Sequence, residues 1–285
     1  MKIAYSSFSQ VAQKEELPYG CQGIRYTLNK VCNELGYDFG SYFKEPDILL
    51  FEVPNMTSMV ISHNACAKAC SMIKTAKRII LVGDDSNTKQ NFRTLSNNKI
   101  PFTLKGDNRK LIKEVLEFQD RILKKEFDII LPVYDESFKD EEYFSKRIIN
   151  FDYSHLHDYV NVYKPEEKRI LSYSFKDSKT IKNCEIISGR ELYCFSRLCR
   201  NRICYMTDYG KNVPKSWVRN RYAQCYYANA LMVGLKESYF GKDFNIRADD
   251  LDNFEEKVYN QRKVFEKMTS SKEHSIDKIK KLFNE

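Results

Sequence analysis

Residues 78–85 read Arg-Ile-Ile-Leu-Val-Gly-Asp-Asp, an apolar run that ends at a glycine and two carboxylates. An uninterrupted run of branched aliphatic side chains is typical of a strand that is buried on both faces of a sheet. Residues 47–53, which read Asp-Ile-Leu-Leu-Phe-Glu-Val, predict a second buried strand, and a helical pattern from about residue 57 to residue 75 separates the two. This order predicts parallel strands joined by a right-handed crossover.

The alternation of strands and helices extends over the first half of the chain. Residues 2–6 predict a strand, and residues 24–35 predict a helix that ends at Gly36. Further strands are expected at 102–104 and 128–133, with a helix over about 109–125 between them. The first half is therefore expected to form a mainly parallel α/β sheet.

A polar, acidic and aromatic stretch at 134–163 is interpreted as the connection to a second, smaller α/β unit. We expect strands in this unit at 169–175, 185–187, 203–206 and 231–233. Helices are expected at 218–230 and 251–268, with Asp249 or Asp250 as the N-cap of the second helix and a loop through Gly241 before it. A final amphipathic helix carries Ile276, Ile279 and Phe283. The predicted units are residues 1–150 and 151–268, followed by a helix at 269–285.

Composition excludes several classes of protein. The chain has 285 residues, of which 42% are hydrophobic, and this is enough for two packed cores. No apolar run approaches the roughly 20 residues that a membrane helix needs, and nine irregularly spaced cysteines without a secretion signal fit reduced thiols. We therefore expect a cytoplasmic protein without a membrane segment.

The net charge of +8 is concentrated in one segment. Between Arg190 and Arg221 the chain has eight basic residues and two acidic ones. Lys215, Arg219 and Arg221 fall at the start of the predicted helix 218–230, where a guanidinium beside a helix N-terminus suits a pyrophosphate. Arg219 and Arg221 are two residues apart and point in different directions, so only one of them is expected to face a ligand. The alternative is a solvated basic face.

Two more strand ends are candidate sites, because ligands of doubly wound sheets bind at the carboxyl ends of strands. Ser6 and Ser7 follow the first strand, and the glycine-containing loop with Tyr19 and Gly20 comes after them. The alternative, which this pattern alone favours, is a loop without a ligand.

Asp84 and Asp85 follow the strand at 78–83 directly. A partly shielded carboxylate at such a place can act as a general base toward a hydroxyl group. The alternative is that one of them caps a helix starting near Thr88. His63, Cys66 and Cys70 fall on one helical face, but such a set is interpreted as packing and not as a metal site.

The chain resembles the GT-B glycosyltransferases, and among them the bacteriophage DNA β-glucosyltransferases. A family motif with an arginine and a glutamate before a Val-Met-Leu strand is similar to residues 220–227, which precede Leu231-Met232-Val233. The resemblance places Arg221 on the UDP diphosphate. It places Gln224 where the family's glutamate binds the ribose hydroxyls, a departure that leaves the nucleotide open.

Further similarities assign other residues. Residues 173–176 resemble the family's phosphate-binding loop, which implies Ser174 and Lys176 as donor ligands, with a lysine in place of the family's arginine. Residues 79–84 are similar to the strand that ends at the catalytic aspartate, which implies Asp84 as the base. Contacts to the acceptor or the sugar are then expected from Ser6, Ser7, Tyr19, Gly20 and Asp85. Residues 244–251 look like the family's closing strand, loop and helix.

The resemblance implies two Rossmann-like lobes facing across a cleft, with the C-terminal helix returning to the N-terminal lobe. It implies inverting transfer from a UDP-sugar to a hydroxymethylated pyrimidine in double-stranded phage DNA, with Mg²⁺ as an aid to the leaving group. A monomer is expected, although the sequence leaves the oligomeric state open, and the place of action is the cytoplasm of the infected host if a phage encodes the chain. Which sugar is moved stays open. A cell-surface polysaccharide or a lipid-linked acceptor is one alternative, and a non-catalytic nucleic-acid-binding protein is another.

Overall fold

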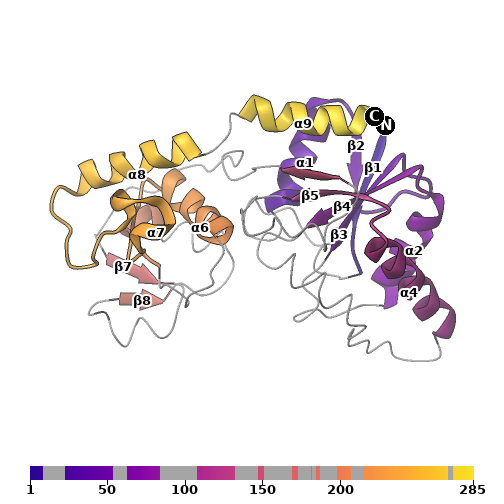
Figure 1. Cartoon of the computed structure of the whole chain (residues 1–285), viewed down its shortest axis with the longest axis horizontal. Helices are drawn as coiled ribbons and strands as arrows, with labels where there is room; N and C mark the ends of the chain where they lie inside the picture. The colour runs from indigo at the N-terminus through magenta and orange to yellow at the C-terminus, as the bar shows by residue number, and fades with distance from the viewer. Residues whose placement is uncertain are drawn as a thin grey trace. The chain divides into compact units, whose positions relative to one another are not determined.

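The computed structural model describes two compact α/β units (Figure 1). The described residues are 1–8, 23–53, 63–83, 108–131, 147–150, 169–172, 181, 184–186, 198–206, 215–268 and 272–285. Unit 1 contains the described residues up to Asn150 together with Glu273–Glu285, and unit 2 contains the described residues from Arg169 to Lys272.

Unit 1 is built on a six-stranded sheet in the order β2-β1-β3-β4-β5-β6, in which every pair is parallel. The strands are β1 (Lys2–Ser6), β2 (Asp38–Gly40), β3 (Ile48–Val53), β4 (Arg78–Gly83), β5 (Asp128–Leu131) and β6 (Ile148–Asn150). The predicted parallel sheet is confirmed, and so are the strands expected at its centre. The strand order reverses between β1 and β3, which makes their carboxyl ends the switch point of the sheet.

The helices of unit 1 are α1 (Gly23–Glu34), α2 (His63–Thr75), α4 (Arg109–Leu123) and α9 (Lys272–Asn284). The predicted end of α1 at Gly36 is confirmed. Gly36 has φ of 68°, its N–H donates to the Asn33 carbonyl at 3.1 Å, and the Tyr37 N–H donates to the Cys32 carbonyl at 2.9 Å. These two bonds form the Schellman arrangement that ends many helices.

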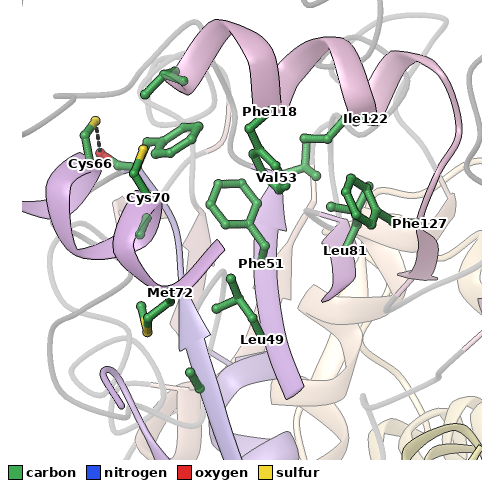
Figure 2. Packing of buried hydrophobic residues seen from close by; sticks show 14 of the residues in the cluster. Leu49, Phe51, Val53, Cys66, Cys70, Met72, Leu81, Phe118, Ile122 and Phe127 are labelled. Carbon is green, nitrogen blue, oxygen red and sulfur yellow. Dashed lines mark hydrogen bonds between the residues drawn. The ribbon is translucent and has the colours of Figure 1, made fainter. Parts of the chain in front are cut away.

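Helices cover both faces of this sheet. On one face, Phe51 of β3 lies edge-on to Phe118 of α4, with ring centroids 4.9 Å apart, and Cys66 and Cys70 of α2 complete the packing (Figure 2). Strand side chains alternate between faces. Tyr5 accordingly points to the opposite face, where the Arg25 guanidinium of α1 lies 5.8 Å from its ring centroid.

The final helix α9 belongs to unit 1, although unit 2 precedes it in the sequence (Figure 1). Its buried side chains are Ile276, Ile279, Leu282 and Phe283. Three polar contacts hold its end: Arg78 donates to the Leu282 carbonyl, the Tyr37 hydroxyl donates to Asn284 Oδ1 at 3.0 Å, and Arg147 pairs with Glu285 at 2.6 Å.

Unit 2 contains a four-stranded parallel sheet in the order β10-β9-β7-β8. Its elements are β7 (Arg169–Ser172), β8 (Cys184–Ile186), β9 (Arg202–Tyr205), α6 (Lys215–Tyr227), β10 (Leu231–Val233), α7 (Glu237–Phe240), the 3₁₀ helix η6 (Lys242–Phe244) and α8 (Phe254–Met268). Across the sheet, from β8 to β10, the second strand in the sequence comes first, followed by the first, the third and the fourth. The first four strands of unit 1 have the same arrangement. The switch point of this sheet lies between β7 and β9.

The core of unit 2 lies between the sheet and α6. Tyr222 of α6 contacts Phe244 and Phe265, with ring centroids 4.7 and 5.1 Å away. A second cluster on the other side of the strands contains Ile203, Val233 and Val258. The sheet of unit 2 is therefore also covered on both faces, as a parallel sheet requires.

Several sequence predictions are wrong. β2 was not expected, and β6 lies inside the stretch 134–163 that was interpreted as a connection. The loop through Gly241 contains α7 and η6, and residues 244–251 contain no closing strand. α8 begins at Phe254, so neither Asp249 nor Asp250 is its N-cap. The predicted strand at 102–104 lies outside the described residues.

Candidate functional site

The carboxyl edge of the sheet in unit 1 is formed by the ends of β1, β3 and β4. Ser6 is in register with Phe51, and Val53 is in register with Gly83. Ser6 and Ser7, predicted as acceptor contacts, lie at this edge at the switch point and are 0% exposed. The Ser6 hydroxyl has no hydrogen-bond partner among the described residues. Their role stays a prediction.

The remaining predicted residues of this edge lie outside the described residues. Tyr19 and Gly20 follow β1 in the sequence, and Asp84 and Asp85 follow Gly83, the last residue of β4. The strand that precedes the predicted base is thus placed beside β3, but the carboxylate itself is not described. Asp84 stays a prediction.

The carboxyl edge of the sheet in unit 2 is more completely described. Tyr205, the last residue of β9, is in register with Ser172 of β7 on one side and with Val233 of β10 on the other. The three strands therefore end at one level. Parallel strands that end together around a switch point form the usual place for a ligand in such sheets.

Gly234 follows β10 and lies against the ring of Tyr205. Its φ is +86°, and a Cβ at this position would lie 2.5 Å from Cε2 of Tyr205. Its N–H donates to the Ile246 carbonyl at 2.8 Å, which holds the segment after η6 beside the strand end. Glycine is required here both by the backbone conformation and by the neighbouring ring.

A cavity of about 590 Å³ opens at this edge, a volume in the range of ligand pockets. Ile170 of β7 and Tyr205 of β9 line it from the two sides of the switch point, and Gly234, Ile246 and Asp249 also line it. We call this cavity the unit 2 pocket. Its walls combine aliphatic side chains and one aromatic ring with a charged rim.

The charged rim is an ion pair between Arg247 and Asp249, both of which line the unit 2 pocket. Arg247 Nε lies 2.9 Å from Asp249 Oδ1, and Nη2 lies 2.8 Å from Oδ2. The hydrogen bond from Arg247 holds the pKa of Asp249 below its ordinary value. Both side chains are exposed, so the pair contributes little to stability and leaves an ionised carboxylate open to a ligand.

The predicted donor residues fall on α6 and after β7. The Ala230 N–H donates to the Cys225 carbonyl at 2.8 Å, which ties the end of α6 to the start of β10. The first turn of this 13-residue helix therefore lies toward the carboxyl edge. Lys215, Arg219 and Arg221 belong to α6, but the helix begins at Lys215 and not at residue 218. Only Lys215 is therefore in its first turn, and the prediction that Arg221 lies at the start of the helix is wrong, since Arg221 is the seventh of 13 residues. The side chains of all three lie outside the described residues.

Gln224 is described, and its side chain lies in the buried part of α6 with only 3% of the residue exposed. Its neighbours Tyr222, Ala223 and Cys225 are all core residues. Ser174 and Lys176 follow β7, which ends at Ser172, and lie outside the described residues. The donor assignments of all these residues stay predictions.

The residues of the unit 2 pocket were not found by sequence reasoning. The available signals were a glycine directly after the expected strand 231–233 and a tyrosine near the end of the expected strand 203–206. A glycine after a strand and a tyrosine near the end of a strand are each common in proteins. Their proximity depends on the register of β9 and β10, which the sequence does not display.

Cys66 and Cys70 pack in the core of unit 1, as interpreted from the sequence. Burial raises the pKa of their thiols to about 11 and about 12. His63 Nε2 instead lies 3.0 Å from Asn108 Oδ1. Within the described ranges, no three His, Cys, Asp or Glu side chains converge as metal ligands would.

The chain matches no protein-family model and no curated protein sequence. In the part of the chain that the structure describes, no helix has the length and apolar character needed to cross a membrane.

Proposed function

We propose that the chain is a glycosyltransferase of the GT-B type that moves a sugar from a UDP-sugar to a hydroxyl acceptor. The observation that carries the proposal is the carboxyl edge of unit 2, where Ser172, Tyr205 and Val233 end three parallel strands at one level. A pocket of about 590 Å³ opens at that edge. The basic helix α6 begins toward the same edge, which suits a ligand with a ring and phosphates.

The donor's diphosphate is proposed to bind beside the N-terminal half of α6, between Lys215 and Arg221. Arg221 would grip two phosphate oxygens, with Lys215 or Arg219 beside it, because a guanidinium matches phosphate geometry. Ser174 and Lys176 would add contacts from the segment after β7. The excess of positive charge between Arg190 and Arg221 supports an anionic ligand here.

Asp84 is proposed as the general base. It would take the proton from the acceptor hydroxyl as that oxygen forms a bond to the anomeric carbon of the sugar. The bond from that carbon to the diphosphate breaks at the same time, and the electron pair leaves with UDP. The cationic groups of unit 2 stabilise the charge that develops on the leaving diphosphate. One displacement inverts the anomeric centre.

A hydroxymethylated pyrimidine in double-stranded DNA is the proposed acceptor. The net charge of +8 favours a polyanionic partner, and a base must leave the stack before an enzyme can reach its substituent. For Mg²⁺, the described residues offer no cluster of ligands.

Mass analysis of nucleosides tests this function. The protein is incubated with hydroxymethylated or ordinary DNA and each of a panel of UDP-sugars, and the DNA is then digested. We expect a hexosylated or pentosylated nucleoside in one pairing with hydroxymethylated DNA only. If no pairing yields a new nucleoside, the DNA acceptor is wrong.

Two variants test the base with a matched control. Asp84→Asn should reduce transfer by about 100-fold or more, while DNA affinity stays within a few-fold of the parent. Asp85→Asn changes the neighbouring carboxylate, a predicted contact of the acceptor or the sugar, and should cost clearly less activity because Asp85 takes no proton in the reaction. Unaltered transfer in Asp84→Asn would remove Asp84 from the mechanism.

A further inference from the structure

We propose that the unit 2 pocket holds the nucleoside of the donor, with the base against Tyr205 and the ribose hydroxyls on Asp249 rather than on Gln224. This inference rests on the proposed function, because it assumes that the donor is a nucleoside diphosphate sugar. The sequence pattern does not indicate this nucleoside site.

The wall formed by Tyr205 suits a planar heterocycle. The ring lies against the backbone of Gly234, where even a methyl group would approach to 2.5 Å, and its position is thus fixed from that side. Ile170 and Ile246 add apolar surface to the same pocket. A nucleobase can stack one face of its ring on Tyr205 and displace water from Ile170 and Ile246.

Asp249 suits a pair of neighbouring hydroxyl groups. A carboxylate has two oxygens that accept hydrogen bonds, and an ionised acceptor forms stronger bonds than an amide does. Arg247 orients this carboxylate through two bonds of 2.9 and 2.8 Å. Each carboxylate oxygen keeps a further lone pair for a ribose hydroxyl.

Gln224 is a poorer candidate for the ribose. It is 3% exposed, and the core residues Tyr222, Ala223 and Cys225 flank it in the helix. Asp249, in contrast, has 69% of its side chain exposed and lines the pocket. A hydroxyl group can reach Asp249 without moving α6.

The phosphates of the bound donor would lie along the carboxyl edge of the sheet. It lies at the switch point between β7 and β9, and Tyr205 is level with Ser172, after which the chain continues to Ser174 and Lys176. The first turn of α6 lies toward the same edge. A nucleoside in the pocket would thus direct its 5′ phosphates along the edge where the basic residues start.

Two pairs of variants separate the pocket from general effects on stability. Gly234→Ala places a methyl group against Tyr205, whereas Gly241→Ala introduces the same kind of strain at φ of +89° with nothing within 4 Å. Asp249→Asn removes the proposed ribose acceptor. Asp250→Asn changes an adjacent exposed carboxylate that instead pairs with Lys257 at 2.6 Å. Circular dichroism and thermal unfolding check that each variant is folded.

Titration calorimetry with small probes is the test. The wild-type chain is titrated with UDP, CDP, ADP and GDP, and the tightest ligand is compared with its 2′-deoxy analogue and with inorganic pyrophosphate. We expect the 2′-deoxy analogue to bind about tenfold more weakly than the parent, as the loss of one hydrogen bond to a charged group predicts.

In Asp249→Asn the gap between the two nucleotides should shrink to about twofold, whereas Asp250→Asn should keep it. Gly234→Ala should weaken nucleotide binding by about tenfold or more, because the methyl group displaces the stacking ring. Gly241→Ala should bind as the wild-type chain does. Pyrophosphate affinity should stay unchanged in all four variants.

The outcomes distinguish this inference from the proposed function. If Asp249→Asn and Gly234→Ala bind nucleotide normally while Arg221→Ala does not, the pocket assignment is wrong and the proposed function stands. If nucleotide binding depends on the pocket but no sugar is transferred in any pairing, the pocket stands and the proposed function falls. If the wild-type chain binds none of the four nucleotides, both are wrong.

Discussion

The side chain of Gln261 forms hydrogen bonds with both backbone groups of Met232. Its Oε1 accepts from the Met232 N–H at 3.0 Å, and its Nε2 donates to the Met232 carbonyl at 2.7 Å. Met232 lies in β10, an edge strand of unit 2, and Gln261 is fully buried in α8. One amide thus replaces a neighbouring strand and closes the edge of the sheet.

Replacing Gln261 by leucine should therefore destabilise unit 2 strongly. The variant leaves the N–H and the carbonyl of Met232 buried without these partners, and each such loss costs about 1–3 kcal/mol. We expect the free energy of unfolding to fall by about 2–6 kcal/mol in urea titrations followed by circular dichroism. A change below about 1 kcal/mol would contradict the edge-closing role.

Gln119 offers a matched comparison in unit 1. It is also buried, in α4, but neither atom of its amide has a hydrogen-bond partner among the described residues. Removing an unsatisfied amide abolishes its desolvation penalty. Gln119→Leu should hence leave the unfolding free energy unchanged or raise it by about 1 kcal/mol in the same assay. A large loss would show that the amide has a partner outside the described residues.

Tyr222→Phe should be tolerated for the same physical reason. The hydroxyl of Tyr222 is buried without a hydrogen-bond partner in the described part of the chain, while its ring packs on Phe244 and Phe265. Phenylalanine keeps the ring contacts, so we expect a thermal midpoint equal to or above that of the parent. Tyr222→Ala, which removes the ring, should cost about 3–5 kcal/mol and serves as the contrast.

Acid should weaken the attachment of α9, because Asp128 pairs with Arg78 and Arg147, the two arginines that contact Leu282 and Glu285. Burial acts to raise the pKa of this carboxyl, but hydrogen bonds from Arg147 and Arg78 outweigh burial and hold the pKa below its ordinary value. The unfolded chain therefore takes up a proton at a higher pH than the folded chain does. The stability from Asp128 is complete above about pH 5, beyond the unfolded pKa, and is lost as the pH falls through the folded pKa.

Urea titrations between pH 3 and pH 7 measure this dependence. Asp128→Asn should be less stable than the parent at pH 7 and should lose less further stability on acidification. Asp120→Asn is the control, because Asp120 forms an exposed pair with Lys124 at 2.6 Å and such pairs contribute little. Parallel acid curves for Asp128→Asn and the parent would count against the Asp128 contribution.

Arg219 and Arg221 should differ in their effect on nucleotide binding, because residues two apart on a helix point in different directions. Arg221→Lys should weaken UDP binding by about tenfold, since a lysine lacks the fork that grips two phosphate oxygens. Arg219→Lys should change it by less than about threefold. Equal effects in calorimetry would mean that α6 does not present Arg221 alone.

The central strands of both sheets were predictable from the sequence, because a strand with neighbours on both sides has a long apolar run. β3 and β4 are of this kind. The two strands at the edges of unit 1, β2 and β6, have only three residues each. An edge strand needs fewer apolar side chains, so Asp38-Phe39-Gly40 carried no recognisable pattern.

The start of α8 was predicted wrongly for a local reason. Asp249 and Asp250 have the side chains of helix N-caps, but Arg247 binds the first and Lys257 binds the second. These ion pairs use the carboxylates that would have capped the helix. Because α8 begins only at Phe254, Asp249 lies in the segment before the helix and lines the unit 2 pocket, which sequence reasoning did not find.

The discontinuity of unit 1 has a consequence for biosynthesis. Its last helix, α9, follows the whole of unit 2 in the sequence. A nascent chain that has been translated to residue 153 therefore lacks α9, whose side chains Ile279 and Leu282 are buried in the complete protein. The apolar surface that receives them stays uncovered on the ribosome until unit 2 has been translated. A chaperone that shields this surface, or rapid folding of unit 2, would limit misfolding during that interval.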